Sequence, residues 1–245
     1  MTSHDETSKQ YYDEFSKQYD DRRGGNVPGG YHDLIDDLEV DTVRRYGTGK
    51  RVLEVGCGTG LLLARFNEFA SKATGIDLSE GMLEKAKARG LDVTLASATQ
   101  LPFADASFDV ACSFKVLAHI PAIDDALSEM ARVVAPGGYV IAEFYNPYSL
   151  RYVAKRIAGA RAVGKNLDES AVFTRFDTPA DAERRAPPGT RFVARRGIRI
   201  ATPAAFALRL PLVAPVLNVV ERSLVDSPLA SVAGFYVAIY RKNDA

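Results

Sequence analysis

The chain has 245 residues and a mass of 26.6 kDa, with 47% hydrophobic and 25% charged residues. This is the composition of an ordinary soluble globular protein, so it excludes wholesale disorder and a fibrous repeat. The formal net charge is zero at pH 7, which argues against a general nucleic-acid binder. The length allows one large domain or one domain with an appendage.

The charges are distributed unevenly along the chain. From Met1 to Met130 there are 22 acidic and 14 basic residues, whereas the remainder has 9 acidic and 17 basic residues. The basic excess consists mostly of arginines between Arg151 and Arg199. Two interpretations stay open: a solvated arginine-rich surface, or a face for an anionic substrate or an anionic lipid.

The two cysteines, Cys57 and Cys112, are too few to staple a chain of this size, and no Cys/His spacing indicates zinc, so we expect no metal site. The polar start MTSHDETSKQ is unlike a signal peptide. The longest apolar run, residues 208–220, is broken by Pro211 and Pro215 and cannot span a bilayer as one straight helix. We therefore expect a protein of the reducing cytoplasm.

The N-terminal segment predicts two helices. Tyr12, Phe15 and Tyr19 recur at three- and four-residue spacing, which predicts an amphipathic helix over residues 9–20. The Gly- and Pro-rich stretch 22–30 predicts a loop. A second helix is expected over 31–46, because glycines follow it.

From residue 50 onward, short apolar runs alternate with helical patterns. The apolar runs predict strands over 50–56, 72–77, 92–97, 108–114 and 139–145. The segments between them predict helices over 59–70, 79–90 and 122–138, the last ended by Pro136-Gly137-Gly138. This alternation indicates a doubly wound α/β fold, with a parallel sheet covered by helices on both faces.

Beyond Asn146 the pattern is looser. We expect a helix after Pro147, irregular charged sequence over 160–190, a strand over 191–200, two short helices between 203 and 224, and a last strand over 234–242.

The most informative segment is VLEVGCGTG, residues 52–60, in which a buried strand runs into a glycine-rich turn that opens a helix. Glycines allow the tight turn and let a ligand approach the bare backbone, and the helix N-terminus offers free N–H groups. Asp77 ends the second predicted strand, 23 residues after Glu54, where a carboxylate can accept hydrogen bonds from both ribose hydroxyls. The pattern predicts an adenosine-containing ligand at the carboxyl edge of the sheet.

The glycine spacing does not spell out a pyrophosphate site. The dinucleotide fingerprint is G-x-G-x-x-G, but here the glycines fall as G-x-G-x-G and Leu61 occupies the place of the third one. A phosphate-binding P-loop requires a lysine after the last glycine, and none follows Gly60.

Four segments together resemble the class I S-adenosylmethionine-dependent methyltransferases of the small-molecule type (methyltransferase type 11-like): VLEVGCGTG, GIDLSEGML, LPFADASFDV and ARVVAPGGYVI. The resemblance covers residues 11–145, with the motifs in order and correctly spaced. It implies a Rossmann-like, mostly parallel seven-stranded sheet with an antiparallel C-terminal strand, N-terminal cover helices and a C-terminal lid insertion. S-adenosyl-L-methionine is the cofactor that it implies.

The resemblance also divides the chain, which we treat as one methyltransferase domain over 1–245. Residues 1–48 would form the cover helices and 49–145 the cofactor-binding core. Residues 146–232 would shape the substrate site, and 233–245 would form the last strand.

The cofactor site that the resemblance implies is drawn from the strand ends and the first helix. Its members would be Tyr12, Tyr19, Glu54, Gly56, Cys57, Gly58, Gly60, Asp77, Leu78, Met82, Ser97, Ala98 and Phe114. Glu54 and the glycine turn would hold the methionine part, Asp77 the ribose, and Leu78 and Met82 the adenine face. Many relatives carry an acidic residue before LPF; here residues 96–100 read ASATQ, so Ser97 or a backbone carbonyl would replace it. Cys57 has no base partner within reach by sequence and is interpreted as a small turn residue.

Methyl transfer from a sulfonium is an in-line displacement, and it needs a general base only if the nucleophile must lose a proton. The best candidate by position is His119, after the fourth strand, whose alternative role is purely structural. Lys115, Tyr145 and Tyr148 are weaker candidates, and Asn146 could position a polar substrate group.

The region after 146 should determine acceptor specificity. It contains arginines followed by an apolar stretch over 206–220, which favours a small amphiphilic acceptor with an acidic group. The arginines in question are Arg151, Arg156, Arg161, Arg175, Arg184, Arg185, Arg195 and Arg196. Charge reversal at Arg195 and Arg196 would test this hypothesis.

Other classes of function stay open on the sequence alone. They are a nicotinamide oxidoreductase, a non-catalytic S-adenosylmethionine-binding regulatory module, and an RNA methyltransferase. We expect no nucleic-acid partner, because no RNA-binding module accompanies the arginines. No transmembrane segment is expected, and the apolar stretch is compatible with a weak contact to a membrane surface. The acceptor, the methylated atom and the oligomeric state are left open.

Overall fold

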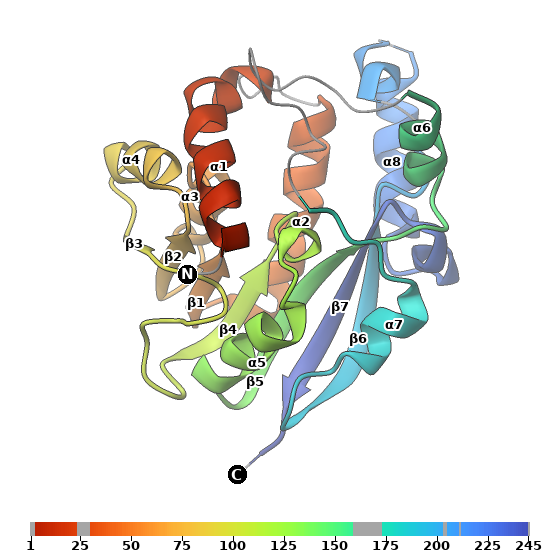
Figure 1. The fold of residues 1–245 in the computed structure, drawn as a ribbon. Helices are drawn as coiled ribbons and strands as arrows, with labels where there is room; N and C mark the ends of the chain where they lie inside the picture. Colours follow the sequence, from red (N-terminus) through yellow and green to blue (C-terminus); the bar gives the residue numbers. More distant parts are fainter. Residues whose placement is uncertain (1–2, 24–29, 159–172, 203–204, 211, 245) are drawn as a thin grey trace.

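The computed structural model describes residues 3–23, 30–158, 173–202, 205–210 and 212–244. Its centre is a seven-stranded sheet with the strand order β3-β2-β1-β4-β5-β7-β6 (Figure 1). The strands are β1 (Arg51–Val55), β2 (Lys72–Asp77), β3 (Val93–Leu95), β4 (Phe108–Ser113), β5 (Val134–Tyr145), β6 (Thr190–Ile198) and β7 (Phe235–Lys242). β1 to β5 are parallel, and β7 pairs antiparallel with both β5 and β6. The predicted sheet and its antiparallel C-terminal strand are confirmed.

Helices flank the sheet. They are α1 (Ser3–Arg22), α2 (Tyr31–Gly47), α3 (Leu61–Phe66), α4 (Glu80–Ala88), α5 (Ile123–Val133), α6 (Leu150–Ala158), α7 (Pro179–Arg184) and α8 (Ala214–Leu224), with 3-10 turns η1 (Leu117–His119), η3 (Ala205–Arg209) and η4 (Pro228–Val232). None of the helices among the described residues has the length and hydropathy needed to cross a membrane.

Alternation along the strands creates two cores. In β1, Val52 packs in the cluster that includes α2 and α3, whereas its neighbour Leu53 packs in the cluster that includes α5. Successive side chains of a strand point to opposite faces, so a nearly continuous apolar run buries both. Cys112 is buried in the first of these clusters.

The helix predicted over 122–138 ends earlier, because β5 begins at Val134. The Pro136-Gly137-Gly138 segment is therefore part of the strand, where the register with β4 is irregular. A Cβ built on Gly138 would lie 2.4 Å from the carbonyl oxygen of Asp109, so the glycine allows a close approach of two strands instead of ending a helix.

The predicted irregular region 160–190 contains a short helix, α7, among its described residues. The Thr178 side chain accepts from the Asp181 N–H, and the Asp181 carboxylate accepts from the Thr178 N–H. This reciprocal capping, with Pro179 at the first helical turn, is a known helix start and was visible in the sequence.

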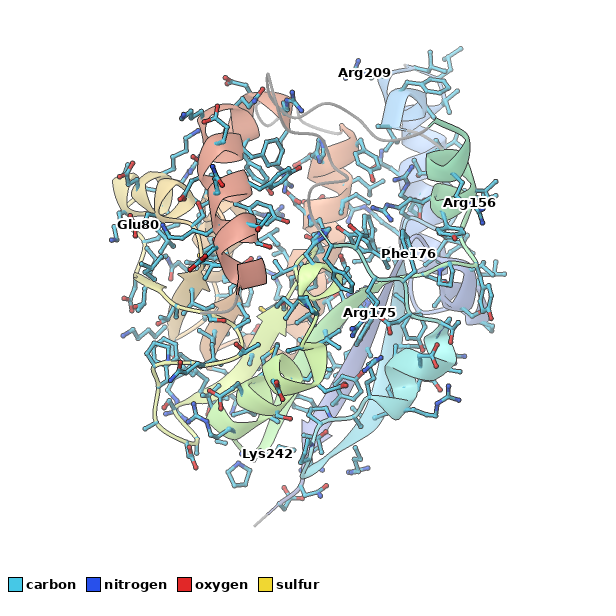
Figure 2. The ribbon with its side chains drawn as sticks, viewed as in Figure 1. Glu80, Arg156, Arg175, Phe176, Arg209 and Lys242 are labelled. Carbon is cyan, nitrogen blue, oxygen red and sulfur yellow. The ribbon has the colours of Figure 1, made fainter. Side chains whose placement is uncertain are left out.

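α1 lies against α4 near the carboxyl edge of the sheet (Figure 1). Asp13 on α1 accepts from the Ser79 hydroxyl at 2.6 Å and from the Gly81 N–H at 3.1 Å, at the start of α4. A Cβ on Gly81 would lie 2.6 Å from Ser16 Oγ, so the two helices are in close contact. At the same junction Lys9 forms an ion pair with Glu80, which Figure 2 labels on α4. These contacts fix α1 as a cover over the edge.

Candidate functional site

A cavity of about 350 Å³ lies at the edge where the parallel strands end. β1 to β5 each contribute residues at or just after their last position, as expected for a doubly wound sheet. Of the residues predicted for the cofactor, these line it: Tyr12, Tyr19, Glu54, Gly56, Cys57, Gly58, Asp77, Leu78, Met82, Ser97, Ala98 and Phe114. Gly60 does not. The described residues contain no group of His, Cys, Asp and Glu side chains that could hold a metal ion.

The three turn glycines all have positive φ, at 79°, 54° and 81° for Gly56, Gly58 and Gly60. A Cβ on Gly56 would lie 2.3 Å from Val116 Cγ2, and one on Gly60 would lie 2.2 Å from Leu91 Cδ1, so these two glycines serve packing. A Cβ on Gly58 would meet nothing within 4 Å. Gly58 is thus the position at which bare backbone faces the cavity.

Asp77 links the turn to the next helix. Its carboxylate accepts from the Gly58 N–H at 2.8 Å and from the Ser79 N–H at 2.9 Å. Burial raises the pKa of Asp77, although these backbone N–H groups act in the opposite direction. Each carboxylate oxygen uses one of its lone pairs in this way, so both can still accept from a ligand hydroxyl.

Glu54 is a buried carboxylate with an unpartnered oxygen. The residue is 3% exposed, and its Oε2 has no hydrogen-bond partner. Burial, reinforced by the negative charge of Glu39, raises the pKa of Glu54 well above its usual range. An unpaired buried carboxylate is costly, and a cationic ligand group placed beside it would remove that cost.

The N-terminal helix covers the cavity with aromatic side chains. Tyr12 and Tyr19 line it as predicted. Tyr11 and Phe15 line it as well, and the sequence pattern does not assign them to the site. The far end of α1 is attached to the glycine turn, because the Thr59 hydroxyl donates to Asp20 at 2.8 Å.

The part of the cavity beyond β3 lacks a carboxylate. The Ser97 hydroxyl is 2.9 Å from the Thr99 hydroxyl, within the turn that follows β3. Ser97 and Ala98 therefore offer backbone groups and a locally engaged hydroxyl. Met82 is buried and Leu78 lies beside it on the lining, so this part of the cavity suits a flat apolar ring.

Cys57 and Lys115 line the cavity, and their surroundings disfavour a role as nucleophile or base at neutral pH. Burial raises the pKa of the Cys57 thiol, so it stays protonated. Lys115 Nζ is 2.9 Å from Glu39 Oε2 and 3.5 Å from Asp36 Oδ1. These carboxylates raise the pKa of Lys115 despite its burial, which disfavours Lys115 as a base.

His119 is held at both ring nitrogens. Its Nδ1 is 2.9 Å from the carbonyl oxygen of Phe173, and its Nε2 is 3.4 Å from the Tyr145 hydroxyl. Because a carbonyl only accepts, Nδ1 carries the proton of the neutral ring and Nε2 carries the lone pair. Both His119 and Tyr145 line the cavity, and burial raises the pKa of Tyr145 to about 12.

Several residues singled out after β5 lie elsewhere. Asn146 is buried, with Nδ2 donating to Ser231 and Oδ1 accepting from the Tyr148 N–H, so it shapes a loop and does not position a substrate. Tyr148 is 65% exposed and outside the lining. Both sequence-based suggestions are corrected.

The two arginines chosen for the charge-reversal test are also outside the lining. Arg195 pairs with Glu183 at 3.4 Å on the surface. Arg196 is buried and pairs with Asp41 at 2.8 Å and Asp226 at 3.0 Å. That test is therefore aimed at residues with structural roles.

Among the described arginines of the basic segment, Arg151 lines the cavity. Arg161 lies outside the described residues. No local sequence signal distinguishes Arg151 from its neighbours, because its place depends on packing against β5 and β7, which are distant in sequence from one another.

One cavity joins a glycine turn, a carboxylate at the end of the second strand and an aromatic cover. This combination is typical of a nucleoside-binding protein of the doubly wound class. The unpartnered Glu54 oxygen and the open side of Gly58 fit a nucleoside that carries a cationic group.

Comparison with known proteins supports this class. Residues 53–142 match the family model described as a methyltransferase domain. The ubiquinone biosynthesis O-methyltransferase of Thiobacillus denitrificans is 33% identical over 60% of this chain and 66% of that protein. The 27-O-demethylrifamycin SV methyltransferase of Amycolatopsis mediterranei is 32% identical over 64% of this chain and 65% of that protein.

The solved structure of the DhpI complex with S-adenosylhomocysteine has the same fold, with a TM-score of 0.66 at 21% identity over 100% of both chains. The predicted resemblance to the class I S-adenosylmethionine-dependent methyltransferases is confirmed. The chain spans about two thirds of the length of these two curated relatives.

Proposed function

We propose that the protein transfers a methyl group from S-adenosylmethionine to a nucleophile of a small-molecule acceptor. The observation that carries this proposal is one cavity that joins the glycine turn and Asp77 to the His119–Tyr145 pair. A regulatory module that only binds the cofactor would have no use for an oriented imidazole in the same cavity.

In this proposal the predicted residues hold the cofactor. Glu54 pairs with the methionyl ammonium, Gly58 lies along the methionine chain, and Asp77 accepts hydrogen bonds from the ribose hydroxyls. Leu78 and Met82 pack on the adenine. When bound, the cofactor supplies a methyl group on a positively charged sulfur, which is already a good leaving group.

The protein then has to orient the acceptor, exclude water and accept a proton. Tyr12 and Phe15 close the cavity from the side of α1. His119 Nε2 accepts the proton of an O–H or N–H nucleophile, while the Phe173 carbonyl keeps the proton on Nδ1. The contact from Tyr145 to Nε2, at 3.4 Å, is long, so an acceptor hydroxyl can replace it.

The acceptor is proposed to be small and amphiphilic, with oxygen as the methylated atom. The names of the ubiquinone and rifamycin relatives describe methylation of oxygen, which supports an oxygen nucleophile here. Phe114, Ile120 and Tyr145 supply apolar walls beside His119.

We also propose that the protein acts in the cytoplasm and without a nucleic-acid partner. Cys57 and Cys112 are both free and buried, which suits a reducing compartment. Arg185 and Arg196 are paired with carboxylates and do not form a free basic face.

The test is release of S-adenosylhomocysteine from S-adenosylmethionine in the presence of acceptors, with quinols, phenols, acidic lipids and amines in the set. Turnover with an acceptor that depends on His119 supports the proposal. Tight cofactor binding with no turnover on any acceptor class would favour the regulatory module.

A further inference from the structure

Arg151, at the start of α6, lines the acceptor side of the cavity. Its guanidinium carbon lies 4.3 Å from the centre of the Tyr145 ring and 4.8 Å from the centre of the Phe235 ring. Contact with two aromatic faces fixes the plane of the guanidinium and takes it partly out of water. The arginine is therefore positioned beside the ring whose hydroxyl contacts His119.

The charge of Arg151 is not neutralised by a neighbouring carboxylate. Its NH1 is fully buried and has no hydrogen-bond partner, and its side chain forms no ion pair with another residue of the described part of the chain. Arg23, which also lines the cavity, is by contrast paired with Asp36. A buried guanidinium nitrogen without an acceptor is costly, and an anionic ligand group would remove that cost.

Glu143, a buried acid that interacts electrostatically with Arg151, has another hydrogen-bond partner. The Glu143 carboxylate accepts from the Lys115 N–H at 3.0 Å. Burial raises the pKa of Glu143 well above its usual range, which disfavours the charged form that would offset a guanidinium.

We propose that Arg151 binds a carboxylate of the acceptor, so that the substrate class is a small hydroxy acid whose nucleophile faces His119. This inference rests on the proposed methyltransferase function and identifies the acceptor class for it. A planar guanidinium binds a carboxylate through two parallel N–H···O bonds, which gives geometric specificity. Tyr145 contacts both Arg151 and His119, so the carboxylate and the nucleophile are separated by about the span of one aromatic ring.

The ionisable residues of the lining divide the cavity into two ends of different charge. The carboxyl groups of Glu54 and Asp77 lie where the cofactor is proposed to bind and would ionise beside its cationic groups, and Arg151 places positive charge over the Tyr145 ring. A cationic cofactor and an anionic acceptor are thereby directed to different ends.

The experiment measures binding of matched acid and amide probes to the protein saturated with S-adenosylhomocysteine. The pairs are hydroxybenzoates with hydroxybenzamides (2-, 3- and 4-substituted) and hydroxylated alkanoic acids with their primary amides. The variants are Arg151→Met, Arg151→Lys and the control Arg156→Met; Arg156 is exposed on the same helix (Figure 2).

The wild type and Arg156→Met should bind at least one acid about tenfold more tightly than its amide. Arg151→Met should bind acid and amide within about twofold of each other, and Arg151→Lys should restore part of the preference. Affinity for S-adenosylhomocysteine should stay within about twofold in all variants, which shows that the cofactor side is intact.

The inference is overturned if no pair favours the acid in the wild type, or if the preference survives in Arg151→Met. Failure of S-adenosylhomocysteine to bind the wild type would instead remove the proposed function on which the inference rests. The two failures are therefore distinguishable.

Discussion

Gly58→Leu should abolish binding of S-adenosylhomocysteine while leaving the fold in place. Gly58 lines the cavity, and a Cβ at this position meets nothing within 4 Å, so a leucine side chain would extend into the space assigned to the cofactor. The matched control is Gly90→Leu. Gly90 also has positive φ, at 75° against 54°, and an equally open Cβ position, but it lies outside the cavity lining.

The two substitutions share one energetic cost. A non-glycine residue with positive φ costs about 1–2 kcal/mol, which for a domain of this size lowers the Tm by roughly 2–8 °C. Only Gly58→Leu adds a steric conflict with the ligand. Overpacking of this kind costs about 1–3 kcal/mol of binding free energy, in addition to the contacts between ligand and backbone that are lost. We expect S-adenosylhomocysteine affinity to fall about 100-fold or more in Gly58→Leu and to change less than about twofold in Gly90→Leu.

The assay is titration calorimetry for affinity together with thermal unfolding for stability. Comparable losses of Tm with a loss of binding confined to Gly58→Leu would support the assigned site. Wild-type affinity in Gly58→Leu, or equal loss of affinity in both variants, would refute the reasoning.

Four further outcomes follow from the described contacts. Glu54→Gln should weaken S-adenosylhomocysteine binding about 10–100-fold. Because burial raises the pKa of Glu54, the wild type should release a proton when the ligand binds and the variant should not, measured by calorimetry in buffers of different ionisation enthalpy. His119→Gln should lower kcat on an O–H acceptor about 10²–10⁴-fold with cofactor affinity unchanged, and an unaltered kcat would leave His119 a structural role. Burial lowers the pKa of His32 from 6.5 to about 4, so between pH 7 and 5 the unfolded chain takes up a proton that the native state does not. Over this range the wild type should lose about 1 kcal/mol of unfolding free energy that His32→Gln retains, measured by denaturant unfolding at both pH values. Arg196→Met should lower the free energy of unfolding by about 2 kcal/mol, which corresponds to a Tm fall of roughly 4–8 °C, and should leave acceptor preference intact. A changed acceptor preference would contradict the structural role of Arg196 beside Asp226.

The part of the site that could be predicted from sequence is the part built by neighbours along the chain. Residues 52–60 specify a buried strand, a turn with positive φ and a helix start within one short segment, and parallel strands bring Asp77 to the same edge. Pattern and periodicity report such local requirements directly.

The part that could not be predicted depends on contacts between distant segments. Arg151 and Arg196 have the same chemistry and similar sequence surroundings, yet one lines the cavity and the other is buried against α2 and Asp226. Similarly, Pro136-Gly137-Gly138 has the composition of a helix terminator, but pairing with β4 makes it an irregular part of β5. Tertiary packing decided each of these cases.

Titration of the wild-type protein with S-adenosylhomocysteine, and separately with NAD, tests the assigned cavity most directly. One molecule of S-adenosylhomocysteine per chain, with a Kd below about 100 μM and no measurable heat from NAD, is the expected result. No binding of S-adenosylhomocysteine at millimolar concentration, or equal binding of NAD, would contradict the account.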